Sequence, residues 1–208
     1  IIVESTGGVY HYLENYSGKK YNEVKAKLEL LGLNVIIEKK DIEDKEKYKD
    51  KIDILCGIEQ DFCSNVSTEG YDYVIGSVHY TEKDGQYYCV DESPEVLEKA
   101  IREGFGGDVY ALTKRFFEME AEVVKKTNAT FIGHFDLVTK FNEGNRFFDP
   151  MDKRYRHAAL EAMDALIETG RPFEINTGGI YRGFRTEAYP SLQLLKDLKE
   201  RGGSILLS

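Results

Sequence analysis

Cysteine, basic residues and long apolar runs are scarce in this sequence, and each shortage excludes a class of protein. Cys56, Cys63 and Cys89 form neither an even disulfide set nor a Cys-x-x-Cys pair, so we expect reduced thiols in a cytoplasmic protein, not a secreted scaffold or zinc finger. The 28 basic residues against 37 acidic ones give a net charge of −9, which disfavours general nucleic-acid binding. No apolar run approaches the roughly 18 residues of a membrane helix, and the first residues do not follow the pattern of a secretory leader, so we expect neither.

Methionine is missing at the start of the chain, and its last residues are apolar. The chain opens at Ile1 and stops at Ser208, directly after the apolar residues Ile205, Leu206 and Leu207. A domain rarely ends inside a core strand, because the unpaired edge of that strand would be exposed. We therefore expect this chain to be the middle of a longer protein.

The 208 residues that are present suffice for one sizeable hydrophobic core. Apolar residues make up 41% of the chain and charged residues 31%, which is typical of a folded globular protein and not of a disordered one. We expect a single domain over residues 1–208.

Short apolar runs alternate with amphipathic helical patterns along the chain. This alternation predicts an α/β fold with a parallel sheet, either doubly wound or closed into a barrel. The lack of a Gly-x-Gly-x-x-Gly motif and of a Walker loop weighs against a nucleotide-binding doubly wound fold. The expected strands are residues 1–3, 33–37, 52–58, 73–78, 130–133, 173–176 and 204–207, and the expected helices are 21–31, 94–103, 108–126, 153–169 and 190–201.

Polar side chains follow several of the expected strands at the point where each strand ends. Glu59 comes just past the apolar run 52–58, His79 and His134 end the next two strands, and Asn176 ends a fourth. In a closed barrel the carboxyl ends of the strands meet at one face, where active sites form. Two imidazoles and a carboxylate brought together there suit zinc, manganese or iron.

A structural reading of the same residues stays open. A single histidine at a strand end is more often a satisfied polar residue than a ligand, and Glu59 alone can be a salt-bridge partner. Gly76 and Gly133 can serve close packing only. Of the other two histidines, we expect His157 to be solvated at a helix start and His11 to lie on a surface loop.

A loop with two arginines follows the fourth of these strands. Arg182 and Arg185 lie close after Asn176, next to a Gly-Gly pair. Guanidinium groups bind phosphate through paired, charge-assisted hydrogen bonds. Beside a metal cluster the phosphate-binding interpretation is the better one, and two solvated arginines are the alternative.

At these residues the sequence resembles the PHP (polymerase and histidinol phosphatase) superfamily, and within it the monofunctional histidinol-phosphatases. Order and spacing agree from about residue 52 to the C-terminus, roughly three-quarters of the chain. The matching motifs are Gly57-Ile58-Glu59, Gly76-Ser77-Val78-His79-Tyr80, Gly133-His134-Phe135-Asp136, Glu174-Ile175-Asn176-Thr177-Gly178-Gly179 and Tyr189-Pro190-Ser191.

The resemblance implies a distorted (β/α) TIM-like barrel of seven strands, incomplete in this chain, with a cluster of up to three divalent metals (Zn, Mn or Fe). It implies that Glu59, His79 and His134 are ligands and that Arg182 or Arg185 binds the substrate phosphate. Asp136 is a candidate for orienting His134 or a bound water, with a helix-start carboxylate as the alternative.

The sequence departs from the family pattern near both ends. No His-x-His strand is present, and the chain stops where an Asp-x-His motif is expected. Ser5 stands where the family has a further histidine ligand, so either that ligand is lost or His11 replaces it. Truncation explains these departures together.

The activity that the resemblance implies is hydrolysis of L-histidinol phosphate to L-histidinol and phosphate, in histidine biosynthesis. Two alternatives stay open. One is the same site acting on another small phosphate ester, and the other is a barrel that has lost metal ligands and serves as a binding module. The acidic chain disfavours a long nucleic acid as substrate.

Overall fold

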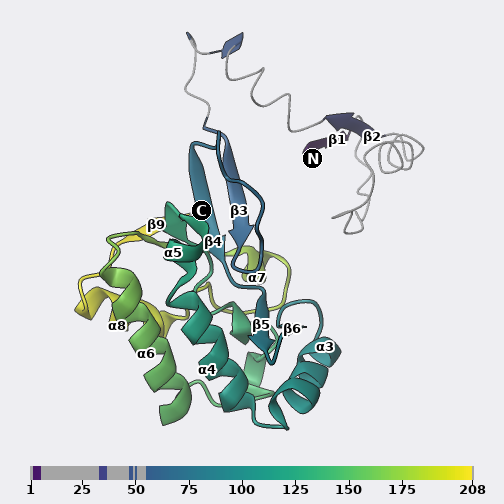
Figure 1. Cartoon of the computed structure of the whole chain (residues 1–208), viewed down its shortest axis with the longest axis vertical. Coiled ribbons are helices and arrows are strands. Elements are labelled where there is room, and N and C mark those ends of the chain that lie inside the picture. Colours follow the sequence, from purple (N-terminus) through teal and green to yellow (C-terminus); the bar gives the residue numbers. More distant parts are fainter. Residues whose placement is uncertain (1, 6–32, 37–46, 49, 51–54, 208) are drawn as a thin grey trace. The chain divides into compact units, whose positions relative to one another are not determined.

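Figure 1 shows the chain as a computed structural model that describes residues 2–5, 33–36, 47–48, 50 and 55–207. The chain divides into two compact units, Ile1–Cys56 and Gly57–Ser208. In the first unit, β1 (Ile2–Ser5) pairs with β2 (Leu33–Ile36) in antiparallel orientation. The expectation of two parallel strands here is wrong, because an apolar run does not specify the orientation of its partner. The helix expected at 21–31 lies outside the described residues.

The second unit is built on a parallel sheet whose five strands follow one another in chain order. Each strand of this sheet therefore lies beside the strand of the sheet that follows it in the sequence. A barrel has this order, whereas a doubly wound sheet reverses its order at a switch point. The strands are β3 (Gly57–Asp61), β4 (Tyr73–Ser77), β7 (Phe131–Ile132), β8 (Phe173–Ile175) and β9 (Ile205–Leu207).

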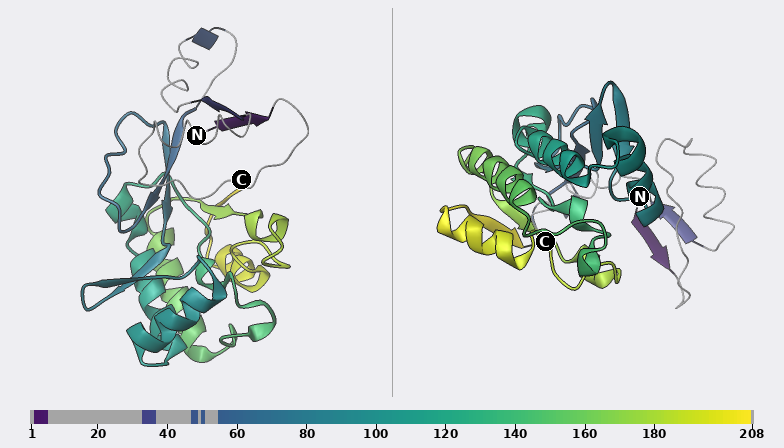
Figure 2. Two further views of the ribbon diagram at one scale, coloured as in Figure 1. Left: turned by 90° about the vertical axis from the view of Figure 1, so that its right-hand side faces the viewer. Right: turned by 90° about the horizontal axis from the view of Figure 1, so that it is seen from below.

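Three of the helices of this unit, α4, α6 and α8, lie side by side in a row, as Figure 2 shows. Helices α3, α4 and α6 have side-chain caps, in which Ser93, Asp108 and Asp152 accept backbone N–H groups of the first turn. No described helix is both long and apolar enough to cross a membrane. The helices are α3 (Pro94–Lys99), continued by a π-helical turn (Ala100–Gly104), α4 (Val109–Glu120), α5 (Val123–Thr127), α6 (Lys153–Ile167), α7 (Gly178–Tyr181) and α8 (Leu192–Glu200).

Three differences from the expected helices stand out. The pattern over 108–126 forms two helices, α4 and α5, because the chain turns at residues 121–122. The stretch 176–185 was expected to be a loop and contains the short helix α7. Two 3₁₀ turns, Leu137–Thr139 and Glu143–Asn145, connect β7 to α6.

A β-hairpin directly after β4 was missed at the level of sequence. It consists of β5 (Tyr80–Lys83) and β6 (Gln86–Cys89), joined by Asp84 and Gly85, both with positive φ. Asp-Gly at a two-residue connection is a strong hairpin signal. Arg115 of α4 fixes the hairpin, since its guanidinium donates to the Glu82 carbonyl at 2.8 Å and carboxylate at 2.9 Å.

The core of the second unit lies between the sheet and helices α4 and α6, which pack against each other. The Phe117 ring of α4 contacts the rings of Phe135 and Tyr155 at centroid distances of 5.3 and 5.2 Å. Because Phe135 lies next to His134 in the chain, this aromatic packing holds the segment after β7 in place. The largest fully buried side chains are Tyr155, Tyr189, Phe116, Phe117, Phe135, Phe173, Leu97, Leu112, Met119, Ile132 and Met163.

Candidate metal centre

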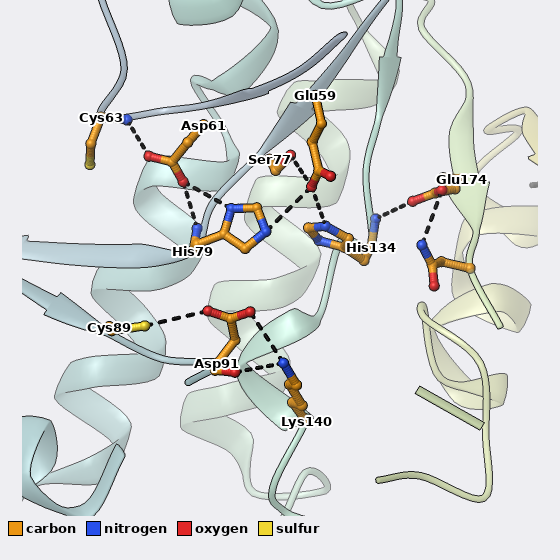
Figure 3. A network of polar contacts seen from close by, with 11 residues as sticks. Glu59, Asp61, Cys63, Ser77, His79, Cys89, Asp91, His134, Lys140 and Glu174 are labelled. Carbon is orange, nitrogen blue, oxygen red and sulfur yellow. Dashed lines mark hydrogen bonds and ion pairs between the residues drawn. The ribbon is translucent and has the colours of Figure 1, made fainter. Parts of the chain in front are cut away.

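Glu59, His79 and His134 meet in the second unit, as Figure 3 shows. Each offers one ligand atom, and these three atoms lie within 4.8 Å of one another. Nε2 of His134 lies 2.9 Å from Oε1 of Glu59, and Nε2 of His79 lies 3.3 Å from the same oxygen. The predicted convergence of these three side chains is therefore present in the structure.

The three residues meet because they come from adjacent parallel strands. Glu59 lies in β3 opposite Ile75 of β4, and His79 and His134 each follow the end of β4 or β7 by two residues. One prediction needs correction, since Glu59 lies inside its strand and not just past it. The described strand runs over Gly57–Asp61, so it extends past the expected end at residue 58, and residues 52–54 of the expected run lie outside the described residues.

Asp61 fixes the orientation of His79. Its Oδ2 accepts the backbone N–H of His79 at 2.9 Å and lies 3.0 Å from Nδ1 of the ring, while its Oδ1 accepts the backbone N–H of Cys63 at 2.7 Å. Burial lowers the pKa of His79, but hydrogen bonds to the carboxylates of Asp61 and Glu59 outweigh burial and raise that pKa to about 10. A proton on Nδ1 directed at Asp61 leaves Nε2 facing Glu59.

Asp61 was missed in the sequence, although a signal was available. Residues two apart on a strand share one face, so Glu59 and Asp61 of β3 point to the same side. The pattern Glu-x-Asp therefore places both carboxylates beside the histidine that ends the next strand.

The Glu59 carboxylate is the most open of the three groups. Its side chain is 46% exposed, against 25% for His79 and 10% for His134. Hydrogen bonds to the rings of His134 and His79 hold the pKa of Glu59 well below its usual range, and the Ser77 hydroxyl donates to Oε1 at 2.8 Å. An ionised carboxylate facing two imidazole nitrogens is a donor set that suits a first-row divalent cation.

Glu174 and Asn176 support His134 from β8 and its end. The backbone N–H of His134 donates to Oε2 of Glu174 at 2.9 Å, and the Asn176 amide donates to Oε1 of Glu174 at 3.1 Å. Asn176, predicted to bind substrate, therefore lies one hydrogen-bonded residue away from His134. The side-chain oxygen Oδ1 of Asn176 also accepts the backbone N–H of Gly178 at 2.8 Å, which fixes the start of α7.

The sequence match decides the family. Residues 30–178 match the family described as "PHP domain". The chain belongs to the PHP domain family. This family has a distorted TIM-like barrel fold, so the expected fold class is confirmed, and five parallel strands of it are described.

Two curated relatives and one solved structure are similar to this PHP chain. It is 30% identical over 174 residues to the "Probable histidinol-phosphatase" of Schizosaccharomyces pombe. The aligned stretch covers 79% of this chain and 55% of that protein. It is also 30% identical over 167 residues to the "Probable histidinol-phosphatase" of Deinococcus radiodurans, with 76% and 56% covered. The chain thus spans about half the length of the curated relatives it matches.

The solved structure shows the fold of the PHP chain independently. It is the crystal structure of the "putative histidinol phosphatase hisK from Listeria monocytogenes", which matches with a TM-score of 0.67 at 19% identity. The match covers 82% of this chain and 68% of that one. At this level of identity, the likeness concerns the fold alone.

The two arginines predicted to bind phosphate have different surroundings in the PHP domain. Arg182 is exposed, and its guanidinium lies over Gly178 near the side-chain oxygen Oδ1 of Asn176. Arg185 is half-buried, and its Nη1 donates to the carbonyl oxygen of Thr139 at 3.0 Å and to the Thr139 hydroxyl. Only Arg182 keeps its guanidinium at the surface.

Asp136 lies two residues after His134 and is fully buried. Its Oδ2 accepts the backbone N–H of Ser191 at 3.0 Å. Burial raises the pKa of Asp136, and the nearby charge of Arg185 opposes that shift. Its other oxygen, Oδ1, has no hydrogen-bond partner within the described part of the chain.

Lys140 was not among the predicted site residues. Its ammonium donates to the Asp91 carbonyl at 2.6 Å, lies 3.3 Å from the Asp91 carboxylate, and has a side chain only 14% exposed. Figure 3 shows both residues on the side of the imidazole rings away from Glu59. The charge of Asp91 raises the pKa of His79, so a cation and an anion lie close to the metal-binding groups.

The remaining expectations concern histidines, Ser5 and cysteines. His157 is solvated as predicted, with a side chain 75% exposed that lies 3.4 Å from Glu161. Cys56, Cys63 and Cys89 form no disulfide among the described residues. Ser5 lies in β1 opposite Leu33, and His11 lies outside the described residues.

Proposed function

We propose that this chain carries metal-binding residues of a PHP-family phosphomonoesterase that hydrolyses L-histidinol phosphate to L-histidinol and phosphate in histidine biosynthesis. One observation carries the proposal: the ligand atoms of Glu59, His79 and His134 converge within 4.8 Å. The choice of substrate is supported by the names of the two curated relatives, both called a probable histidinol-phosphatase.

The donor set fits a divalent cation for two reasons. The Glu59 carboxylate is ionised, and Asp61 binds Nδ1 of His79, so that Nε2, which faces Glu59, is the ring nitrogen that would bind a cation in exchange for its proton. We propose that Glu59, His79 and His134 bind zinc, manganese or iron, since this mixture of nitrogen and oxygen suits all three. A cluster of up to three cations, as the resemblance implies, requires further ligands.

A bound divalent cation supplies Lewis-acid chemistry, since it lowers the pKa of a bound water and polarises a phosphoryl oxygen. The residues of the chain then have separate tasks. Glu59, at 46% exposure, lies at the open side of the site, where a phosphate ester can approach. The backbone N–H of His134 donates to the Glu174 carboxylate, and this hydrogen bond keeps His134 in position as substrate enters and leaves.

Arg182 is the arginine that we propose for phosphate binding. Its guanidinium is exposed, and Asn176, which lies beside it, belongs to the hydrogen-bonded chain that holds His134. Arg185 instead donates a hydrogen bond from Nη1 to Thr139, and it positions the segment that contains Thr139. The expected partner is a small phosphorylated substrate, and cysteines that are not joined in disulfides support a cytoplasmic location.

The test is phosphate release from L-histidinol phosphate by the full-length protein, with added manganese or zinc and with a chelator as control. We expect chelator-sensitive turnover that His134→Ala abolishes. His157→Ala is the matched control, because this solvated histidine lies on α6 and binds no group of the site. Its turnover should equal that of the wild type.

Other outcomes discriminate the alternatives. Turnover of glycerol phosphate or a nucleotide, with L-histidinol phosphate left intact, would assign the site to another phosphate ester. Absence of both stoichiometric metal and turnover would identify a non-catalytic barrel and overturn the proposal. Full activity in His134→Ala would refute the ligand assignment.

A further inference from the structure

The ammonium group of Lys140 lies where three segments of the second unit meet, and the proposed function leaves it unused. Lys140 donates to the backbone carbonyl of Asp91 at 2.6 Å and lies 3.3 Å from the Asp91 carboxylate. Its Nζ also lies 5.3 Å from the centre of the Phe184 ring. A lysine side chain is rarely as buried as this one, at 14% exposure, unless it is paired. Lys140 therefore joins its own segment to two others through contacts that are largely shielded from water.

The contact with Asp91 leads to the backbone of His79. Val90, directly before Asp91, donates its backbone N–H to the His79 carbonyl at 3.0 Å. One residue earlier, Cys89 of β6 pairs with Tyr80 of β5. These backbone contacts join the end of the hairpin to its start, so they fix the position of Asp91 relative to His79.

Lys140 is held relative to His134 in the same way. Leu137 donates its backbone N–H to the His134 carbonyl at 2.8 Å, and Lys140 donates its own backbone N–H to the Leu137 carbonyl at 2.8 Å. These two turns follow one another directly in the chain. The ion pair of Lys140 with Asp91 thus joins the segment of His134 to the segment of His79.

The parallel sheet ends before it reaches the two histidines. The backbone N–H of Gly133 donates to the Gly76 carbonyl at 2.8 Å, and both histidines come after this hydrogen bond in their segments. Beyond it, in the part of the chain that the structure describes, the hydrogen bonds that join these two segments directly are those of Lys140 to Asp91.

The imidazole rings lie between this ion pair and Glu59. The centroids of the His79 and His134 rings are 5.1 Å apart, and the ring planes meet at 68°. Glu59 contacts Nε2 of both rings, and Figure 3 shows the ion pair on the other side of them. A bound cation would replace the contacts with Glu59, whereas the ion pair would stay. The separation of the two rings therefore depends on the ion pair.

The third segment that Lys140 contacts is the loop that carries Arg182. The Phe184 ring lies edge-on to the Phe141 ring at 5.6 Å, and Nζ of Lys140 lies 5.3 and 5.4 Å from the two ring centres. A cation over an aromatic ring is attracted by the negative face of the ring. Arg185 also donates to the backbone carbonyl of the residue before Lys140 at 3.0 Å. These contacts dock the loop onto the turn that carries Lys140.

Stability alone does not account for a largely buried ion pair at this place. Replacing such a pair by apolar residues of similar volume is often neutral or stabilising, because both charges lose their hydration on burial. We propose that Lys140 is a positioning residue. It holds His79 and His134 at the separation at which both bind one divalent cation, and it holds the loop of Arg182 beside them. The inference rests on the proposed function for the role of these residues.

The first test needs neither metal nor substrate, since it measures the contact between the two imidazole rings. NMR of the metal-free wild type should show NOEs between ring protons of His79 and His134, because the ring centroids are 5.1 Å apart. We expect Lys140→Met to lose these NOEs. Asp91→Asn keeps the backbone acceptor of Lys140 and should lose less of their intensity. Unchanged NOEs in both variants would overturn the proposal.

Arg115→Met is the matched control. Arg115 binds the same hairpin through an ion pair with Glu82 at 2.9 Å, but this pair joins the hairpin to α4 and not to the segment of His134. Its ring NOEs should equal those of the wild type. Equal losses in Arg115→Met and Lys140→Met would show that any loosening of the hairpin moves the rings, and would overturn the proposal.

Cobalt and substrate binding separate the two tasks of Lys140. Loss of a group that positions a metal-binding histidine typically weakens metal affinity 10–100-fold, so we expect about tenfold weaker Co²⁺ binding in Lys140→Met and none of this loss in Arg115→Met. Phe184→Leu frees only the loop of Arg182, so it should keep the wild-type Co²⁺ affinity and raise the KM for L-histidinol phosphate.

The outcomes distinguish this inference from the proposed function. Wild-type Co²⁺ affinity in Lys140→Met would overturn the inference and leave the metal site standing. A wild-type protein that binds no metal would overturn the proposed function, and the ring NOEs would then decide whether Lys140 positions the two histidines.

Discussion

At the scale of single residues, the orientation of His79 depends on one carboxylate. Asp61 binds both the backbone N–H and the ring Nδ1 of His79. We predict that Asp61→Asn weakens binding of Mn²⁺ or Zn²⁺ about 10–100-fold, because an amide holds the imidazole less firmly than a carboxylate does. Isothermal titration calorimetry measures this loss, with Asp84→Asn in the hairpin turn as the control. Equal affinities in the two variants would contradict the assignment.

Glu120 permits a prediction about stability and pH. Burial raises its pKa well above the usual value, with only the charge of His79 opposing the shift while Asp136 and Asp61 add to it. The folded protein therefore keeps a proton that the unfolded chain releases above pH of about 4.3. The contribution of Glu120 to stability is greatest below that pH and falls as pH rises toward the pKa of Glu120 in the folded state.

Glu120→Gln removes this dependence, since glutamine has the same shape and no charge. We predict that the variant equals the wild type near pH 4 and becomes more stable than it as pH rises, by up to ~1.4 kcal/mol per pH unit. Urea unfolding at pH 4, 5.5 and 7 measures the difference. Curves that stay parallel across this range would show that Glu120 is ionised in the folded protein.

At the scale of secondary-structure elements, Gly76 sets the distance between β4 and α5. A Cβ atom at this position would lie 2.7 Å from the Cβ of Ala129 and 2.9 Å from Oγ1 of Thr127. We predict that Gly76→Ala costs about 1–3 kcal/mol of unfolding free energy, as overpacking does. The double variant with Ala129→Gly should recover part of this loss in urea unfolding. Strictly additive losses would exclude the contact.

The elements also show what the sequence could predict. The helix starts at Ser93 and Asp108 were predictable, because a side-chain cap is a local signal. The hairpin had a local signal too, Asp84-Gly85, which the prediction overlooked. The end of β3 was not predictable, because the apolar run 52–58 does not reveal that the pairing with β4 continues to Asp61. That uncertainty of a few residues placed Glu59 past the strand instead of inside it.

At the scale of the whole molecule, the site combines residues far apart in the chain. Glu59 and His134 are 75 residues apart and lie in contact. The sequence predicted this convergence because parallel strands in chain order place their ends at one edge. It could not predict the burial of Asp136 and Tyr155, since that burial depends on how the helices pack on the sheet, and neither periodicity nor motif spacing records it.

Metal binding should also raise the unfolding free energy of the whole molecule. A ligand that binds only the folded state stabilises it in proportion to the logarithm of its concentration. The ligand atoms of Glu59, His79 and His134 come from three segments that only the folded sheet brings together, so the unfolded chain offers no such site. We predict that Mn²⁺ or Zn²⁺ at a hundred times its dissociation constant adds about 2.7 kcal/mol to the unfolding free energy.

Urea unfolding with metal and with chelator measures this gain. Glu59→Gln replaces the shared carboxylate, so its stability should respond little to added metal. Glu69→Gln, an exposed residue outside the site, should respond as the wild type does. Because the metal acts through the folded sheet, the gain should also rise by about 1.4 kcal/mol for each further tenfold in metal concentration. A gain equal in all three proteins would place the metal elsewhere on this acidic chain.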